Sequence, residues 1–516
     1  MKKDLVIGID CSTTACKAIA WDSSGVAVGQ GRFPIPLERP QPGWHEQPAD
    51  AWWQAALHAI NQLSGQIGLS RLAGLAIAVQ RETFVPVDDK GRALRPGIVW
   101  MDERSRTILS DFSHRIGQER VHTISGKPLS GNLSLSKIEW IRQFEPDIFS
   151  RTAYYQDVHA YLVTQFTGNF KTSWGTADPM GLFDMRENTW SADLLQRVGV
   201  SPAQMPDAYP PGTYLGEVTA IAARLSGLPQ GLPVFAGIGD GQAGALGAGL
   251  ALAGETCINL GTAVVSATGS DQYMTDPAFR TTYAGLPGSF LLETVLLGGS
   301  YTVSWFIEQF AHPLTTSDAR LTQSEDTWEA AAAVLPPGAQ GLMLVPYWNS
   351  VMSPYWDAGA SGMVVGWRGI HTPAHLYRAI LEGIAYELLL QIEGVERILA
   401  SGNSSYPAPK SFILFGGGSK SPLWRKILAD ITGKPILLSP VVEATALGAG
   451  ILASCGVGWF PDLPSAITGM TRTPRLVIEP DPQNTNIYHQ LYEEVYRGLF
   501  PAVQSALDRL TELTEE

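Results

Sequence analysis

LVIGIDCSTTACKAIAW, residues 5–21, decides how the chain begins to fold. Residues 5–9 are a short apolar run, which predicts a buried strand, and the polar residues 10–14 predict a turn. Residues 17–21 return as a second strand, and a further turn leads into a third strand over 26–32. The stretch is therefore predicted to be a β-meander whose first turn is rich in hydroxyl groups.

A second region repeats the order of strand, hydroxyl-bearing turn and strand. Residues 255–260 are predicted to be a strand, 261–263 a turn and 264–268 the returning strand. The two hairpins match in form rather than residue by residue. A chain of 516 residues is also too long for one ordinary hydrophobic core. We therefore expect an α/β protein of two similar domains that face each other.

The boundary between the two domains is expected near residue 250. The first domain then spans residues 1–250 and the second spans 251–485, and a C-terminal helix over 486–516 packs on the fold. The last segment supports this helix because apolar residues recur there at helical spacing.

Composition limits the partners and the location of the protein. Hydrophobic residues make up 45% and charged residues 16%, which is typical of a well-packed globular enzyme. The net charge of -13 argues against nucleic acid or an anionic membrane surface as the main partner, because both attract basic patches. The four cysteines lack the spacing of a zinc site or a disulfide framework. Reduced thiols, no signal peptide and a cytoplasmic location are the expectation.

Three turns that follow apolar strands carry glycine, serine or threonine. They are residues 10–14, 261–262 and 416–419. Glycine lets backbone N–H groups approach an anion closely, and hydroxyl groups add donors. Three such turns can hold a nucleoside triphosphate between two domains. The chain contains no G-x-x-x-x-G-K-[ST] motif, so a P-loop is excluded.

GIGDGQAG, residues 237–244, matches the G-x-G-x-x-G pattern of dinucleotide-binding turns. Asp240 would stand where the pyrophosphate binds and would repel it, so we reject that interpretation. A carboxylate at a strand end between two glycines is instead open to a substrate hydroxyl, as phosphoryl transfer requires of its base. Asp10, beside the first turn, is the natural carboxylate for a metal ion. The alternative for Asp240 is a helix N-cap.

Five segments, in order along the chain, resemble signatures of the FGGY carbohydrate kinase family, in the form closest to its xylulose kinases. They are GIDCSTT at 8–14, SKIEW at 136–140, GIGD at 237–240, LGTA at 260–263 and GGGSKSPLW at 416–424. The resemblance runs along nearly all of the chain. It implies two ribonuclease-H-like domains of the actin, hexokinase and Hsp70 superfamily, with a deep cleft between them.

The resemblance also implies roles for particular residues. Asp240 is expected to be the general base, and Asp10 is expected on the Mg²⁺ side. The residues expected to border ATP are Ser12, Thr13, Thr14, Gly261, Thr262, Gly417, Gly418 and Ser419. The residues expected to border the sugar are Gln80, Arg81, Glu82, Trp100 and Asp102. The first domain would then carry the sugar side and the second the nucleotide side.

The substrate signals are divided. Residues 80–83 look like the glycerol-kinase form of their loop, whereas residues 100–104 are closer to the xylulose-kinase type. We expect an ATP-dependent kinase of a small ketose, with a D-xylulose-like pentulose first and glycerol or another polyol as the alternative. A non-catalytic sugar or nucleotide sensor and a nucleotide-dependent oxidoreductase are rival functions. Arg81 and Glu82 have an alternative of their own as a strand-end ion pair, and a homodimer is the expected assembly.

Overall fold

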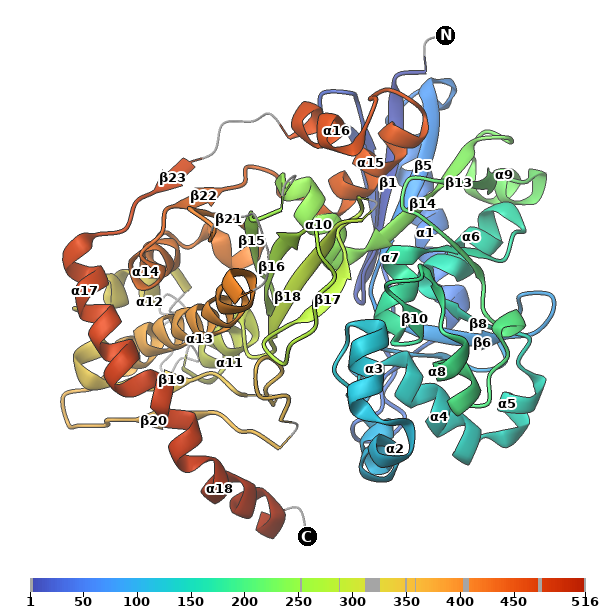
Figure 1. The fold of residues 1–516 in the computed structure, drawn as a ribbon. Helices are drawn as coiled ribbons and strands as arrows, with labels where there is room; N and C mark the ends of the chain where they lie inside the picture. The colour runs from blue at the N-terminus through green and yellow to red at the C-terminus, as the bar shows by residue number, and fades with distance from the viewer. Residues whose placement is uncertain are drawn as a thin grey trace, which may run out of the picture.

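The computed structural model describes residues 3–250, 253–286, 288–310, 325–348, 350–357, 359–401, 408–471 and 476–514. Figure 1 shows two α/β halves, each built around its own sheet. The expected domain boundary meets residues 251–252, which lie outside the described residues. The limits of the domains therefore stay a prediction.

The first sheet contains six strands within the described residues. In spatial order they are β13 (Tyr214–Glu217), β14 (Pro233–Gly239), β5 (Leu72–Val79), β1 (Leu5–Cys11), β2 (Ala15–Trp21) and β3 (Ala27–Pro34). Strands β14, β5 and β1 are parallel, and the other neighbours are antiparallel. Every residue of β1 and β5 is buried, as expected of central strands that are covered on both faces.

The second sheet repeats this arrangement. Its strands, again in spatial order, are β17 (Arg280–Tyr283), β18 (Phe290–Leu296), β16 (Val264–Ser270), β15 (Thr256–Leu260), β21 (Phe412–Phe415), β22 (Ile436–Leu438) and β23 (Leu476–Ile478). Apart from β17, which only the second sheet has, each sheet has an antiparallel meander of three strands, then two strands that continue in parallel, and an antiparallel edge strand. The prediction of two similar α/β domains is confirmed.

Helices and short strands surround the two sheets. The helices before residue 250 are α1 (Ala49–Ser64), α2 (Leu109–Ile116), α3 (Gln118–Ser125), α4 (Ser134–Phe144), α5 (Pro146–Arg151), α6 (Val158–Thr167), α7 (Trp174–Ala177), α8 (Ala192–Arg197), α9 (Ala220–Ser226) and α10 (Asp240–Ala248). The later helices are α11 (Ser300–Phe310), α12 (Glu325–Ala333), α13 (Pro373–Ser401), α14 (Pro422–Thr432), α15 (Ala444–Gly456), α16 (Leu463–Met470), α17 (Pro482–Leu491) and α18 (Arg497–Thr514). The short strands are β4 (Glu46–Gln47), β6 (Phe84–Val87), β7 (Gly97–Ile98), β8 (Tyr154–Asp157), β9 (Lys171–Ser173), β10 (Phe183–Asp184), β11 (Thr189–Trp190), β12 (Asp207–Tyr209), β19 (Met343–Val345) and β20 (Met363–Val365).

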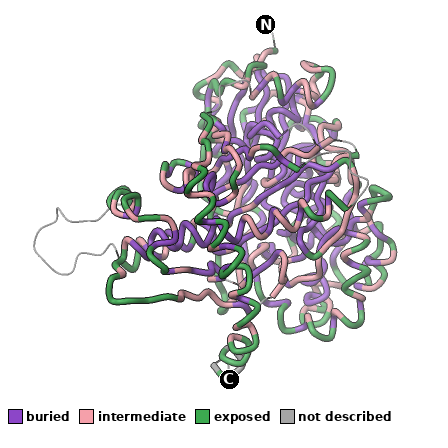
Figure 2. Tube along the Cα trace, turned by 60° about the vertical axis from the view of Figure 1, so that its left-hand side comes forward, coloured by how far each residue is buried: buried purple, intermediate pink, exposed green. Residues whose placement is uncertain are grey.

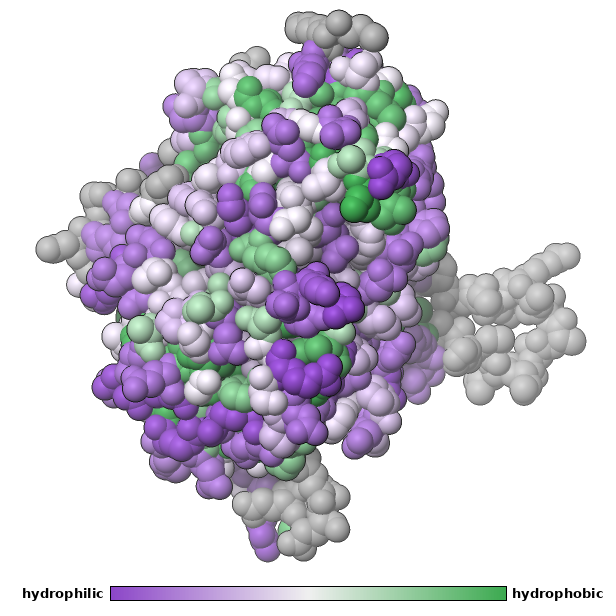
Figure 3. Space-filling view, turned by 90° about the vertical axis from the view of Figure 1, so that its right-hand side faces the viewer, coloured by the Kyte–Doolittle hydropathy of each residue, from purple (hydrophilic) through white to green (hydrophobic). Residues whose placement is uncertain are grey.

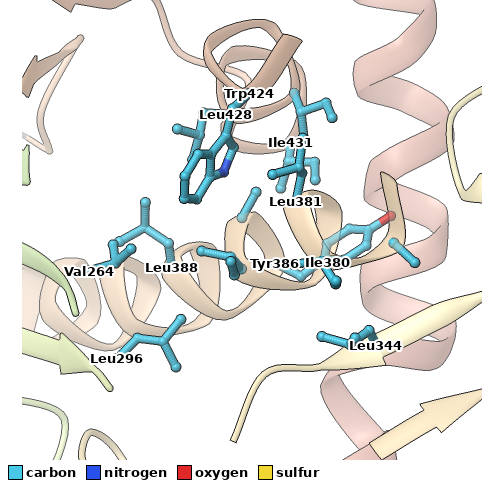
Figure 4. Close-up of a cluster of buried hydrophobic side chains, with 14 of the residues drawn as sticks. Val264, Leu296, Leu344, Ile380, Leu381, Tyr386, Leu388, Trp424, Leu428 and Ile431 are labelled. Carbon is cyan, nitrogen blue, oxygen red and sulfur yellow. The ribbon is translucent and has the colours of Figure 1, made fainter. Parts of the chain in front are cut away.

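The core of the second half is built around the long helix α13. Figure 4 shows Leu388 of α13 near Val264 and Leu296 of the sheet, with Trp424 of α14 above the helix. The C-terminal segment joins the same core, because Tyr488 is 1% exposed and lies in the same hydrophobic cluster. Helices α17 and α18 therefore run along the outside of this half (Figure 1).

Helices α10 and α15 connect the two halves. Helix α10 follows β14 directly and packs on strands of the second sheet, whereas α15 lies against β1 of the first sheet (Figure 1). A Cβ atom on Gly247 would lie 1.9 Å from the carbonyl oxygen of Ala444, and one on Gly448 would lie 2.0 Å from that of Ala243. The two helices can cross this closely only because both positions are glycine. The crossing fixes the start of α10, where Asp240 lies.

The surface shows how burial is distributed. Buried residues fill the middle of both halves, and exposed ones lie on the outer helices and loops (Figure 2). On the face in Figure 3, hydrophilic and apolar residues are interspersed.

None of the described helices has the length and hydropathy that crossing a membrane requires. All four cysteines are free thiols, and three of them are buried.

Candidate active site

Three parallel strands bring the expected site residues to one edge of the first sheet. Asp10 lies near the carboxyl end of β1, Gln80 follows β5, and Asp240 follows β14. The strands end in register, since Asp10 pairs with Ala78 and Gly239 pairs with Val79. Ligands of open α/β sheets bind beyond the carboxyl ends of the strands, so this edge is the candidate site.

Asp240 presents an accessible carboxylate at this edge. Its side chain is 39% exposed. Its Oδ1 atom accepts the N–H of Gly241 at 2.8 Å and lies 3.3 Å from Nε of Arg81, while no described residue donates to Oδ2. The local burial raises the pKa of Asp240, and the charge of Arg81 opposes that rise. The helix cap is Gly239, with no side-chain capping bond, so the N-cap alternative for Asp240 is wrong.

Arg81 and Glu82 bind partners from the second half of the chain rather than each other. Nη1 of Arg81 donates to Oε1 and Oε2 of Glu293 at 3.1 and 2.9 Å. Oε1 of Glu82 accepts from Nη1 of Arg280 at 2.7 Å. All four residues are buried. The alternative of an ion pair between Arg81 and Glu82 is therefore wrong in its partners.

Trp100, Thr13 and Gln80 form a hydrogen-bonded chain. Nε1 of Trp100 donates to the hydroxyl of Thr13 at 2.9 Å, and that hydroxyl donates to Oε1 of Gln80 at 3.1 Å. Nε2 of Gln80 donates to Gln47 at 2.8 Å. Thr13, which we expected beside ATP, is thus tied to two residues that we expected beside the sugar.

Asp102 is fully used inside the protein. Its two oxygens accept from Nε and Nη2 of Arg104, each at 2.8 Å, and from the N–H of His45 at 2.6 Å. The Asp102 side chain has no exposed surface. It holds Arg104, whose guanidinium carbon lies 3.9 Å from the centre of the Trp44 ring. The structure does not bring Asp102 to the accessible face where Asp240 lies.

Asp10 has the properties of a carboxylate that could bind a cation. Its Oδ1 atom is buried without a hydrogen-bond partner. Burial, and next the charge of Asp240, raise the pKa of Asp10 to about 7. No cluster of three or more His, Cys, Asp or Glu side chains in the described part of the chain could hold a metal. Mg²⁺ that is bound through nucleotide phosphates needs only one or two carboxylates, so Asp10 fits such an ion.

The second sheet brings two of the predicted phosphate turns together. Strands β15 and β21 are parallel neighbours, so Gly261 and Gly416 follow them at the same edge. Gly417 faces open space, because no atom lies within 4 Å of a Cβ built there. Thr262 is exposed, and so is Thr14 in the first domain. These three positions are accessible to a ligand.

Other predicted nucleotide residues are used within their own turns. The hydroxyl of Ser12 donates to the carbonyl of Ala15 at 2.9 Å, and that of Ser419 donates to the carbonyl of Gly416 at 2.7 Å. A Cβ on Gly418 would lie 2.4 Å from the ring of Trp424. Ser12, Ser419 and Gly418 therefore shape the turns in this structure.

Sequence reasoning missed Arg280, Glu293 and the role of Lys137. The signal for Glu293 was a single carboxylate inside the apolar run FLLETVL. Lys137 is fully buried, and its Nζ donates to the carbonyls of Val99 and Trp100 at 2.9 and 3.1 Å. Burial lowers the pKa of Lys137 to about 7. This lysine fixes the backbone that presents Trp100.

Two family models cover most of the chain. The N-terminal domain of the FGGY family of carbohydrate kinases matches residues 5–247, and the C-terminal domain matches residues 257–457. The chain belongs to the FGGY family of carbohydrate kinases. It is an ATP-dependent sugar kinase with the two-domain α/β fold of the actin and hexokinase superfamily, as the sequence predicted.

Individual relatives extend over nearly the full length. A xylulose kinase of Staphylococcus epidermidis is 29% identical over 99% of both chains. An autoinducer-2 kinase of Klebsiella pneumoniae is 28% identical over 97% of this chain and 95% of its own. The crystal structure of xylulose kinase from Rhodospirillum rubrum superposes with a TM-score of 0.86 at 28% identity, covering 98% of this chain and 99% of that one.

Proposed function

We propose that this FGGY kinase transfers the terminal phosphoryl group of ATP to a hydroxyl of a small neutral ketose, with a D-xylulose-like pentulose as the first choice. The observation that carries the proposal is the accessible Asp240 carboxylate beside Arg81. The xylulose kinases among the relatives support the pentulose.

Asp240 acts as the general base. Its Oδ2 atom has no donor among the described residues, and it accepts the proton of the sugar hydroxyl as that oxygen attacks phosphorus. Its raised pKa makes it a better proton acceptor than an aspartate with an unshifted pKa. Because phosphoryl transfer proceeds through a loose transition state, positioning and charge stabilisation supply most of the catalysis.

The charges around the site favour a neutral substrate. Arg81 and Arg280 are the two cations that form ion pairs with Glu82, Glu293 and Asp240. The five groups therefore carry one net negative charge when all are ionised. A sugar acid would add a second uncompensated carboxylate beside Asp240, and like charges repel strongly where water is excluded. A neutral polyhydroxyl compound meets no such repulsion.

Mg²⁺ is the proposed cofactor, and it would bind together with the ATP that this family uses. Thr14, Thr262 and Gly417 are the accessible positions of the three phosphate turns. Asp10 would hold the magnesium ion, which would neutralise phosphate charge during transfer. A homodimer and a cytoplasmic location stay predictions.

Glycerol or another polyol is the alternative acceptor. Arg81 and Glu82 favour it, since these residues gave the sequence its likeness to glycerol kinases. Arg81 lies 3.3 Å from Asp240, and the charge of Glu82 acts on the Asp240 carboxylate. A non-catalytic sensor is less well supported, because a sensor does not need an accessible base beside an unpartnered metal-side carboxylate.

The test is ADP release by the purified chain with ATP and Mg²⁺. D-Xylulose, glycerol and D-gluconate are compared, with Asp240→Asn as the control for contaminating kinases. We expect turnover with D-xylulose, less with glycerol and none with gluconate. Faster turnover with gluconate would contradict the charge argument, and no turnover with any acceptor would favour the sensor.

A further inference from the structure

The second domain supplies half of a closed group of four charges beside Asp240. Arg280 and Glu293 are register partners on the antiparallel strands β17 and β18, so their side chains stand next to each other. Nε of Arg280 donates to Oε1 of Glu293 at 2.5 Å. Arg81 and Glu82, consecutive in the first domain, lie across from this pair and each binds the member of opposite charge.

The backbone of Glu82 makes this arrangement possible. Consecutive side chains of an extended strand point to opposite sides, so Arg81 and Glu82 could not both face the Arg280–Glu293 pair from a regular β conformation. Glu82 has a φ of 56°, in the left-handed region that residues other than glycine rarely adopt. The hydroxyl of Ser134 donates to its carbonyl at 3.1 Å and holds it there. Such strain is typically retained at functional sites.

Gly241 leaves the space that the group occupies. A Cβ atom at this position would lie 3.0 Å from Nη2 of Arg81 and 3.2 Å from Oε2 of Glu293. Glycine after Asp240 therefore keeps the base and the four charges in direct proximity.

A donor of Arg81 and an acceptor of Glu82 are left for a ligand. Nη1 of Arg81 is used by Glu293 and Oε1 of Glu82 by Arg280. In the part of the chain that the structure describes, no hydrogen bond uses Nη2 of Arg81 or Oε2 of Glu82. A guanidinium N–H and a carboxylate oxygen side by side match two adjacent hydroxyls, each of which both donates and accepts.

We propose that Glu293 and Arg280 are positioning residues for the sugar. Glu293 fixes the guanidinium of Arg81, and Arg280 fixes the carboxylate of Glu82, so the second domain aims both groups at adjacent hydroxyls of a neutral sugar. This inference rests on the proposed function, because it takes Arg81 and Glu82 as groups that bind the acceptor.

The competing explanation is a purely structural bridge between the domains. Breaking a buried ion pair destabilises a protein wherever the pair lies, so stability alone does not separate the two roles. The separating measurement is the KM for sugar against the KM for ATP. A positioning role raises the KM for sugar and leaves the KM for ATP unchanged. A structural role lowers the melting temperature without a selective effect on the KM for sugar.

Three variants test the role: Glu293→Gln, Arg280→Met and Arg280→Lys. Arg280→Lys retains the buried charge and the fold but cannot bind Glu293 and Glu82 through two separate nitrogens. We expect each variant to raise the KM for D-xylulose about 10- to 100-fold while the KM for ATP stays within about twofold. Glu382→Gln is the matched control, since it breaks another buried pair, with Arg378 at 2.7 Å in α13. It should lower the melting temperature without moving the KM for D-xylulose.

A double-mutant cycle shows whether Arg280 acts through Glu82. If it does, Arg280→Met and Glu82→Gln together raise the KM for D-xylulose no more than Glu82→Gln alone. Additive effects, or an unchanged KM in folded Arg280→Lys, would overturn the inference. Wild-type turnover tests the proposed function separately. Turnover of glycerol but not of D-xylulose would overturn the proposed pentulose substrate, and the double-mutant cycle would then be measured with glycerol. A wild type that turns over neither overturns both proposals.

Discussion

Oδ1 of Asp240 lies 3.3 Å from Nε of Arg81, so the proposed base and a proposed sugar-binding cation are direct neighbours. They follow adjacent parallel strands, β14 and β5, and reach the same edge of the sheet for that reason. Burial makes the carboxylate more basic, and the guanidinium keeps that rise in check. This environment suits a general base, because the Asp240 carboxylate must stay ionised until it accepts the hydroxyl proton.

Asp240→Asn is expected to lower kcat at least ~100-fold, because an amide cannot accept the hydroxyl proton. The KM for sugar and the KM for ATP should change little, since Arg81 keeps both of its bonds to Glu293. Steady-state kinetics with D-xylulose would measure all three constants. Near wild-type turnover would remove Asp240 from the mechanism.

Gly241→Ala is expected to raise the KM for sugar, and Gly417→Ala is expected to raise the KM for ATP. The alanine Cβ at 241 would crowd Nη2 of Arg81 at 3.0 Å, and Arg81 cannot move freely while Glu293 and Asp240 hold it. The KM for sugar should therefore rise several-fold. At position 417 no atom lies within 4 Å, so the fold accepts the methyl group and only a bound nucleotide would meet it.

Kinetics of the two alanine variants with one sugar and ATP give the comparison. Gly417→Ala should raise the KM for ATP and leave that for sugar unchanged, with a melting temperature like that of the wild type. If Gly241→Ala raised both constants equally, the crowding would reflect a general distortion of the start of α10.

The secondary structure of the site was predictable from local sequence. Apolar runs that end in Gly, Ser or Thr located the edges of both sheets, and one carboxylate between glycines located Asp240. These signals are local, because a buried strand and the turn after it are contiguous in the chain.

The partners of the charged side chains were not predictable in this way. Arg81 and Glu293 are 212 residues apart in the chain and meet only because two domains fold against each other. Asp102 shows the same limit for a local partner. Its carboxylate was expected beside the sugar, but both of its oxygens accept hydrogen bonds from Arg104. Sequence spacing reports the position of a residue on its own element and does not report which bonds its side chain has already formed.

Gly448→Ala is expected to destabilise the crossing of α15 with α10. Its Cβ would lie 2.0 Å from the carbonyl oxygen of Ala243, and backbone cannot yield as a flexible side chain can. Overpacking of this kind costs about 1–3 kcal/mol. Gly498→Ala in α18 is the matched control, because open space surrounds that position and alanine favours a helix by up to about 1 kcal/mol.

Thermal unfolding of both glycine variants measures the difference. The melting temperature should fall for Gly448→Ala and hold or rise for Gly498→Ala. Equal melting temperatures for Gly448→Ala and the wild type would show that the two helices can separate without loss, which the close contact argues against.

Glu387 is expected to make stability depend on pH. It is fully buried in α13, where its Oε2 atom accepts from the hydroxyls of Tyr347 and Tyr496 at 2.9 and 3.0 Å, and no ion pair to a cation is found for it among the described residues. Burial raises its pKa from 4.5 to about 7. Below pH 4.5 the carboxyl is protonated in both states and nothing is lost.

Between pH 4.5 and about 7 the unfolded chain releases the Glu387 proton and the folded chain keeps it, so the free energy of unfolding falls as pH rises. Above about pH 7 both states are ionised and the loss stays constant, at about 3 kcal/mol for a shift of this size. Glu387→Gln removes the titration, and its amide oxygen can still accept from both tyrosines. Its melting temperature relative to the wild type should therefore rise between about pH 5 and about pH 8. The same difference at both pH values would show that Glu387 is ionised in the folded protein throughout, with a cation or water that compensates it.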